Sequence, residues 1–104
     1  MQRYRAIIKR PDEKYGHVTN ISTSLENLQN IVGGPIEVVR LMDDHVLIVN
    51  ERGKLKGLQQ NFKIPGDIIV GEAVVLGVKG EEFTDATIDW KVWRWLLEIW
   101  GNVV

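Results

Sequence analysis

Short runs of valine and isoleucine, separated by turn-forming residues, recur through most of this chain. The two residue types make up 24 of its 104 residues, and their β-branched side chains pack well on the pleated surface of a sheet. Glycine, proline and aspartate divide the runs into segments of strand length. We therefore predict a chain rich in β-structure, with strands over Arg3–Lys9, Gly16–Ile21, Ile36–Met42, His45–Asn50 and Asp67–Val78.

One segment between these strands has the spacing of a helix. Thr23 and Glu26 stand three residues apart, as in a capping box, where each side chain bonds a free amide at the start of a helix. The apolar residues that follow share one helical face, namely Leu25, Leu28, Ile31 and Val32. Gly33-Gly34 and Pro35 then stop the helix. This pattern predicts a helix over about 24–32.

The connections between the strands are less regular. Asp43-Asp44 joins two predicted strands, although two aspartates make a poorer hairpin turn than Asn-Gly. Residues 50–66 combine closely spaced lysines, glycines and three consecutive amides, which predicts a long ordered loop with room for a brief helical turn. Residues 80–84 are predicted as a turn. Gly71 and Gly77 are predicted bulges or points of close backbone approach.

A second helix is predicted near the end of the sequence, over about 88–100. Thr87 is its expected N-cap and Gly101 its C-terminal stop. At 104 residues the sequence has the length of one domain, so we expect a single unit over 1–104. The order of elements predicts an α+β fold with a mostly antiparallel sheet packed against two helices.

The second helix has more apolar surface than one core can cover. At 100° per residue, its polar residues Lys91, Arg94 and Glu98 occupy an arc of only about 60°, whereas the apolar residues spread over roughly 220°. A stripe of about 100° is enough to dock a surface helix on one core. The stripe through Trp93, Leu96 and Trp100 is expected to face the sheet, with other apolar residues at its edges.

Three explanations account for the excess apolar arc. A small sheet can curl around the helix and cover both edges, the helix can form a homo-oligomer interface, or it can bind an aromatic ligand or another protein. We favour self-association at this point. The residues expected at that interface are Trp90, Trp93, Trp95 and Ile99.

Several classes of function are disfavoured by composition. The sequence has no cysteine, which excludes disulfides, thiolate nucleophiles and zinc ribbons. His17 and His45 lack partnered spacing, no serine or threonine lies beside an expected base, and no phosphate-loop or dinucleotide motif occurs. We therefore expect no enzyme, no metal and no cofactor.

Charge and hydropathy limit the partners. The net charge of −1 disfavours duplex nucleic acid, which usually selects a basic excess. No apolar run reaches the length of a membrane span, and Met1–Arg10 lacks the core of a signal peptide. We therefore expect a cytoplasmic chain without a membrane partner.

The distribution of charge suggests a binding site for an anion. Residues 1–20 and residues 50–66 each carry a net charge of +3, whereas 21–49 and 67–104 carry −3 and −4. Arg3, Arg5 and Lys9 share one face of the first predicted strand. If the loop that holds Lys54 lies near that face, a compact cationic pocket forms, although an ordinary solvated strand face gives the same pattern.

Such a pocket suits a phosphorylated small molecule better than an extended polyanion. Arginine and lysine would bind the phosphates, asparagine and glutamine amides would read a base or ribose, and Trp90 or Trp95 could stack on a base. The predicted ligand-binding residues are Arg3, Arg5, Asn50, Lys54, Lys56, Gln60 and Asn61.

The middle of the chain carries a set of residues with a specific spacing. They are Ala6-Ile7-Ile8-Lys9, Leu28, Ile31-Val32-Gly33-Gly34, Ile36-Glu37-Val38, Asn50-Glu51, Gly53-Lys54-Leu55, Gly57-Leu58, Asn61 and Ile69-Val70-Gly71. Over roughly residues 5–80 this pattern resembles a family of small proteins from bacteriophages and mobile elements that is defined as a domain of unknown function. The tryptophan-rich segment after residue 87 has no counterpart in the resemblance.

The resemblance implies an α+β fold and a viral or mobile-element origin, and it supplies no reaction. Small non-catalytic phage proteins often antagonise host defence, for example by sequestering a nucleotide second messenger. Our leading hypothesis is therefore a homo-oligomeric binder that sequesters a phosphorylated, nucleotide-like signal. The alternative is an inhibitor that docks its tryptophan helix onto a host protein. A weaker third hypothesis is a module for single-stranded nucleic acid.

Overall fold

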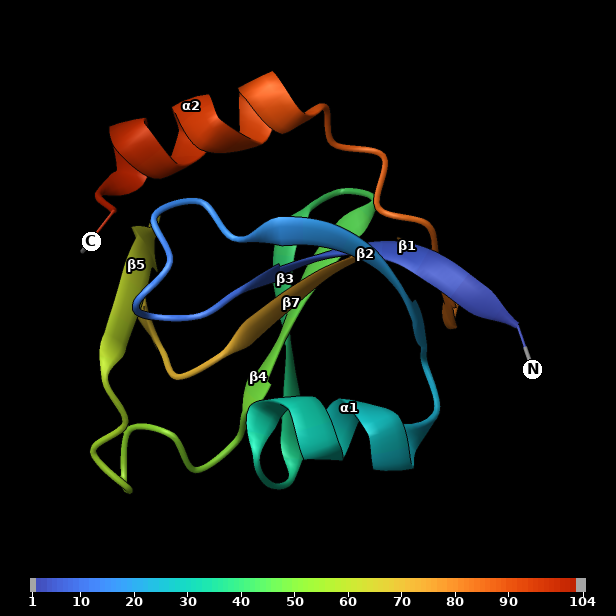
Figure 1. Ribbon diagram of the computed structural model, residues 1–104, viewed down its shortest axis with the longest axis horizontal. Helices are drawn as coiled ribbons and strands as arrows, with labels where there is room; N and C mark the ends of the chain where they lie inside the picture. The colour runs from blue at the N-terminus through green and yellow to red at the C-terminus, as the bar shows by residue number, and fades with distance from the viewer. Residues whose placement is uncertain (1, 103–104) are drawn as a thin grey trace.

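The computed structural model describes residues 2–102 and has an α+β architecture, as the sequence predicts. Two helices lie on opposite sides of a mostly antiparallel sheet, α1 (Leu25–Val32) below it and α2 (Trp90–Trp100) above it in Figure 1. The sheet contains β1 (Arg3–Lys9), β2 (His17–Ser22), β3 (Ile36–Met42), β4 (His45–Asn50), β7 (Ala73–Lys79) and β8 (Glu82–Thr84). Its strand order is β2-β1-β7-β4-β3, with β8 added to β7.

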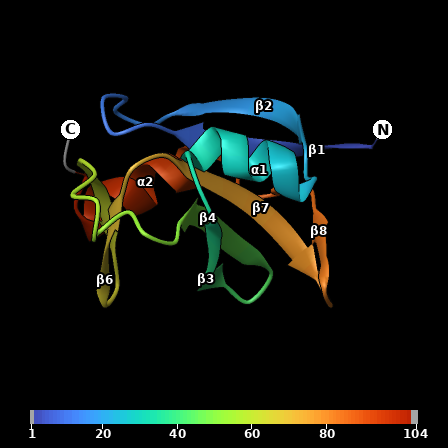
Figure 2. The same cartoon turned by 90° about the horizontal axis from the view of Figure 1, so that it is seen from below.

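A second, two-stranded sheet stands beside the first (Figure 2). It is a hairpin of β5 (Gln60–Ile64) and β6 (Asp67–Val70). The predicted loop over residues 50–66 therefore ends at residue 59, and the prediction was wrong for the residues of β5 that follow. Phe62 and Ile64 turn into the core as strand residues do, and a bulge between Gln60 and Phe62 moves the amide of Asn61 inward as well.

The two helices each cover a separate apolar cluster. Leu28 and Val32 of α1 pack with Ile8, Ile48 and Val74 on one face of the sheet. On the other face, Trp93 and Leu97 of α2 pack with sheet residues such as Ile7 and Leu47 and with Phe62 of the hairpin. All six residues of β4 are buried because both faces of this strand are covered.

The helices begin later than the sequence predicts. Ser24 caps α1, accepting a hydrogen bond from the backbone N–H of Asn27 at 3.2 Å, so the Thr23–Glu26 capping box does not form. Asp89 caps α2 through a hydrogen bond of 2.9 Å from the N–H of Lys91, in place of Thr87. Ser24 and Asp89 stand directly before the first helical residues, where their side chains reach the free amides at the two helix starts.

Two further boundaries differ from the prediction. Residues 82–84 form the short strand β8 where a turn was predicted, and β6 and β7 are separate strands within the predicted run 67–78. Gly71 divides that run with a φ of 72°. Gly77 is a point of close approach, as predicted, because a Cβ there would lie 2.3 Å from the carbonyl oxygen of Asp85.

Candidate functional site

Two of the three basic residues on one face of β1 are engaged by the protein itself, whereas Arg3 is exposed. Arg5 binds the segment that leads to α2, donating its backbone N–H to Asp85 Oδ1 at 2.7 Å and its Nη1–H to the carbonyl of Ala86. Lys9, on the same face, is 1% exposed. At Arg5 the segment before α2 occupies this face, and at Lys9 the turn after β1 and the side chain of Asn61 occupy it.

The amine of Lys9 is satisfied inside the protein. Nζ donates to Asn61 Oδ1 at 2.6 Å and to the carbonyl of Glu13 at 2.7 Å, and it lies 5.8 Å from the ring centre of Phe62. Burial lowers the pKa of Lys9, and the negative charges of Glu13 and Asp12 offset this only in part. Lys9 is therefore a structural group.

Two of the three predicted reading amides also have structural roles. Asn61 is wholly buried, and its Nδ2 donates to the carbonyls of Lys9 and Gly71, both at 2.8 Å. Asn50 donates to the carbonyl of Val32 at 3.1 Å and accepts the N–H of Arg52 at 2.8 Å. The predicted role of Asn50 and Asn61 in reading a ligand is therefore corrected, because both amides are occupied by backbone partners. The third amide, Gln60, is exposed.

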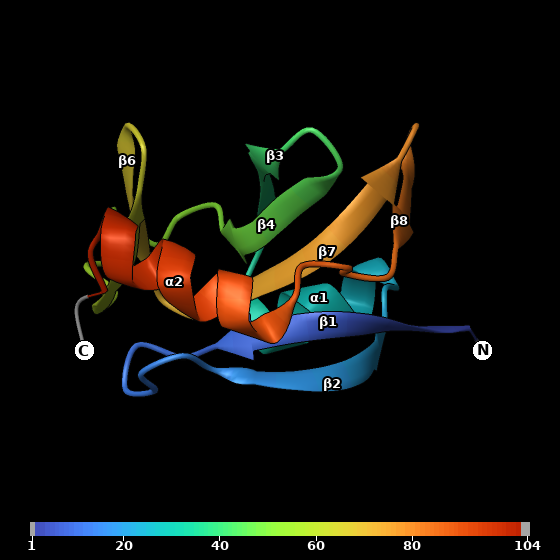
Figure 3. The same cartoon turned by 90° about the horizontal axis from the view of Figure 1, so that it is seen from above.

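The remaining predicted cations do not converge. Lys54 forms an ion pair with Asp67, and Lys56 is exposed in the turn that follows. Arg3 lies at the N-terminal end of β1, at the opposite end of the molecule from the 50–60 loop (Figures 1 and 3). The seven predicted residues therefore form no common pocket.

A different hollow brings together two amines and an indole. Lys54, Lys63 and Trp100 line an open depression of about 650 Å³ between the β5–β6 hairpin and the end of α2, together with Asp67. Lys63 and Trp100 were not among the predicted ligand-binding residues. The two residues come close together because the β5–β6 hairpin lies beside the end of α2, and the amide-rich sequence did not indicate that hairpin.

Helix α2 presents part of its apolar arc to solvent. Trp93 is wholly buried, packs edge-on against Phe62 with 5.7 Å between ring centres, and donates its indole N–H to the carbonyl of Tyr15 at 2.8 Å. Trp93 therefore belongs to the core and cannot serve as an interface residue, which corrects the prediction. Trp90 is half-buried against the same core. Trp95 and Ile99 remain 58% and 57% exposed.

The exposed residues of α2 form a stripe. Val92, at 44% exposure, joins Trp95 and Ile99, and at 100° per residue the three span only about 60° of the helix. We call these three residues the α2 stripe. Leu96, half-buried, lies beside it, so the stripe borders the core directly.

The turn after β1 holds α2 in this orientation. The hydroxyl of Tyr15 donates to Glu98 Oε1 at 2.7 Å, and the guanidinium of Arg94 lies 4.4 Å from the centre of the Tyr15 ring. Both contacts engage the polar side of the helix. They leave the α2 stripe on the outer surface.

One arrangement resembles a nucleophilic triad. Nδ1 of buried His45 lies 2.9 Å from Asp44 Oδ1, and Nε2 lies 3.4 Å from the hydroxyl of Thr87. The hydrogen bond from His45 lowers the pKa of Asp44. However, Nε2 accepts the backbone N–H of Thr87 at 2.9 Å, so its lone pair is occupied and the hydroxyl is not activated. Sequence reasoning missed this contact because residues 45 and 87 are far apart in the chain.

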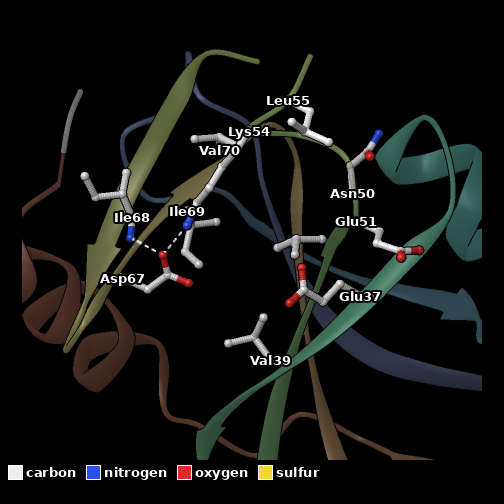
Figure 4. A pocket seen from close by; sticks show the side chains of 11 residues that line it. Glu37, Val39, Asn50, Glu51, Lys54, Leu55, Asp67, Ile68, Ile69 and Val70 are labelled. Carbon is white, nitrogen blue, oxygen red and sulfur yellow. Dashed lines mark hydrogen bonds and ion pairs between the residues drawn. The ribbon is translucent and has the colours of Figure 1, made fainter. Parts of the chain in front are cut away.

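A compact pocket opens between β3, the end of β4 and the β5–β6 hairpin (Figure 4). Its volume is about 120 Å³, and its apolar wall is formed by Val39, Val49, Ile69 and Val70. Glu37, Glu51 and Asp67 bring carboxylates to it, and Lys54 supplies one amine. The excess of carboxylates makes this pocket unsuited to phosphate.

Residues 2–102 offer neither a cluster of metal ligands nor a membrane-spanning helix. No group of three or more histidine, aspartate and glutamate side chains in this range could hold a metal ion. Neither helix of the described chain is long and apolar enough to cross a membrane.

Comparison with known proteins places the chain in a family. The model of a domain of unknown function, DUF3846, matches residues 3–94, which include every strand and the first part of α2. No curated protein and no solved structure matches the chain. Because the family model spans most of the sequence, the chain belongs to the DUF3846 family.

Proposed function

We propose that this chain is a non-catalytic accessory protein of a bacteriophage or mobile element, and that it inhibits a host protein in the bacterial cytoplasm by docking the α2 stripe onto it. One observation carries this proposal. Val92, Trp95 and Ile99 remain exposed on one face of a helix that buries Trp93 and Leu97 in the core on another face. Among the surfaces described, the stripe is the best suited to a macromolecule.

The chemistry of the stripe fits a protein partner. A tryptophan side chain can bury about 150–250 Å² on binding, and tryptophan is among the residues that most often dominate interface energies. Helix α2 is anchored on its buried side by Trp93, which donates to the carbonyl of Tyr15, and on its polar side by the hydrogen bond between Tyr15 and Glu98. A helix held in this way loses little conformational entropy when it docks.

The test compares two exposed apolar residues on different helices. Trp95→Glu places a charge in the α2 stripe, whereas Leu25→Glu makes the same kind of change at a residue of α1 that is also 58% exposed. A host protein that copurifies with the tagged chain should be lost with Trp95→Glu and retained with Leu25→Glu. Equal retention by both variants would contradict the proposal.

A second candidate function is sequestration of a phosphorylated, nucleotide-like signal. It is favoured by the hollow where Lys54, Lys63 and Trp100 meet, because amines can bind phosphate and an indole can stack on a base. A homo-oligomer with such a ligand would appear in native mass spectrometry as a multimer with releasable mass of a few hundred daltons. Lys63→Glu should remove that mass and Trp95→Glu should not; the opposite pattern would exclude the hollow as the site.

A further inference from the structure

The groove between β3 and β6 has two open strand edges. β3 is the last strand of the larger sheet and pairs only with β4, and β6 pairs only with β5. Within residues 2–102, no backbone hydrogen bond joins the outer edge of β3 to another element. An exposed edge of this kind can accept an added strand through its free amide and carbonyl groups.

The pocket described above opens into this groove. Val39 and Val49 from the sheet and Ile69 and Val70 from the hairpin give it an apolar wall. At about 120 Å³ it has room for one long side chain and not for a nucleotide. At its mouth, the side chain of Leu55 is 90% exposed.

The charges around the pocket select the side chain that it would hold. Asp67 is paired with Lys54, but Glu37 and Glu51 form no ion pair with any described residue. The carboxyl groups of Glu37 and Asp67 lie on opposite sides of the opening (Figure 4). An apolar wall below a rim of carboxylates matches the aliphatic stem and cationic head of lysine or arginine.

We propose that this groove binds an extended basic segment of a partner protein, which pairs with the open edge of β3 and places one lysine or arginine side chain in the pocket. Main-chain hydrogen bonds supply affinity, and the pocket supplies the preference for a cation. This site is separate from the α2 stripe. It stands or falls independently of the function proposed above.

The probe is a capped decapeptide of alternating valine and arginine, labelled at one end and titrated by fluorescence anisotropy. A valine–glutamine decapeptide and free arginine serve as comparisons. The double variant Glu37→Gln, Glu51→Gln removes the rim charges. The control double variant Glu81→Gln, Glu82→Gln removes the same number of exposed charges at the start of β8. Amide chemical shifts report where the peptide binds.

The proposal predicts that the rim variant binds the arginine peptide about tenfold more weakly and the control variant within about twofold of the original chain. The amide shifts should lie along β3 and β6, and N-methylation of alternate peptide amides should abolish binding. The proposal is overturned if no arginine peptide binds, if both variants bind alike, if the glutamine peptide binds equally well, or if free arginine competes as strongly as the peptide.

Discussion

The amine of Lys9 donates a hydrogen bond of 2.6 Å to Oδ1 of Asn61, across 52 positions of sequence and inside the protein. The other end of the same amide donates back to the carbonyl of Lys9 at 2.8 Å. This reciprocal pair links β1 to the bulge of the β5–β6 hairpin. It thereby connects the hairpin, which forms one side of the groove, to the central sheet.

Replacement of Asn61 by alanine should therefore destabilise the protein. The variant leaves the buried amine of Lys9 with one acceptor fewer and removes the donor to the carbonyls of Lys9 and Gly71. Each unsatisfied buried group costs about 1–3 kcal/mol, so we expect a loss of about 2–4 kcal/mol in the free energy of unfolding measured with urea. Gln60→Ala, at the exposed neighbouring position, should change it by less than about 0.5 kcal/mol.

The two tryptophans on opposite sides of α2 should respond differently to truncation. Trp93→Ala opens a cavity in the core and should cost about 3–5 kcal/mol of unfolding free energy. Trp95→Ala removes an exposed side chain and should alter it by less than about 0.5 kcal/mol. Equal losses of unfolding free energy in the two variants would contradict the burial of Trp93 and the exposure of Trp95.

Ionisation of Asp67 should depend on Lys54. The hydrogen bond from Lys54 holds the pKa of Asp67 below its ordinary value of 3.8. Because the folded pKa is lowered, this pair stabilises the fold above pH 3.8, and its contribution is lost as pH falls through the folded pKa. In Lys54→Gln, a carboxyl carbon NMR titration should show the pKa of Asp67 rising toward its ordinary value. Lys56→Gln should leave it unchanged, and no rise in Lys54→Gln would refute the pairing.

The segment before α2 should loosen when its histidine acceptor is removed. His45 accepts the backbone N–H of Thr87 through Nε2, and phenylalanine fills a similar space without accepting it. His45→Phe should therefore accelerate hydrogen exchange of the Thr87 amide and lower stability by about 1–3 kcal/mol. His17→Phe, at an exposed position of β2, is the matched control. Unchanged exchange at Thr87 in His45→Phe would show that the contact does not protect that amide.

The strands with strong β-branched patterns were predictable from sequence. Arg3–Lys9, Ile36–Met42 and His45–Asn50 have the bounds that hydrophobic patterning predicts. The strand β5 was missed because Gln59, Gln60 and Asn61 resemble a loop in composition. A bulge that turns an asparagine inward depends on partners from distant parts of the chain, and local patterning does not indicate it.

The predicted grouping of basic residues differs from the structure for a related reason. A period of two correctly placed Arg5 and Lys9 on one strand face, but it does not tell whether that face is solvated. The uninterrupted apolar run Val46–Val49 was the available signal, because a strand that is apolar on both faces implies cover on both sides of the sheet. The apolar excess of α2, in contrast, follows from helical spacing alone, and exposure of Trp95 and Ile99 agrees with it.

The most direct test of the proposed function is photo-cross-linking from position 95. The full-length chain, with a photoreactive phenylalanine derivative in place of Trp95, is expressed in host cells and irradiated, and the adducts are identified by mass spectrometry. The account predicts one heterologous protein adduct that disappears when Ile99→Glu is added and persists with Leu25→Glu. Adducts only with a second copy of the chain, or no adduct at all, would contradict docking of the α2 stripe onto a host protein.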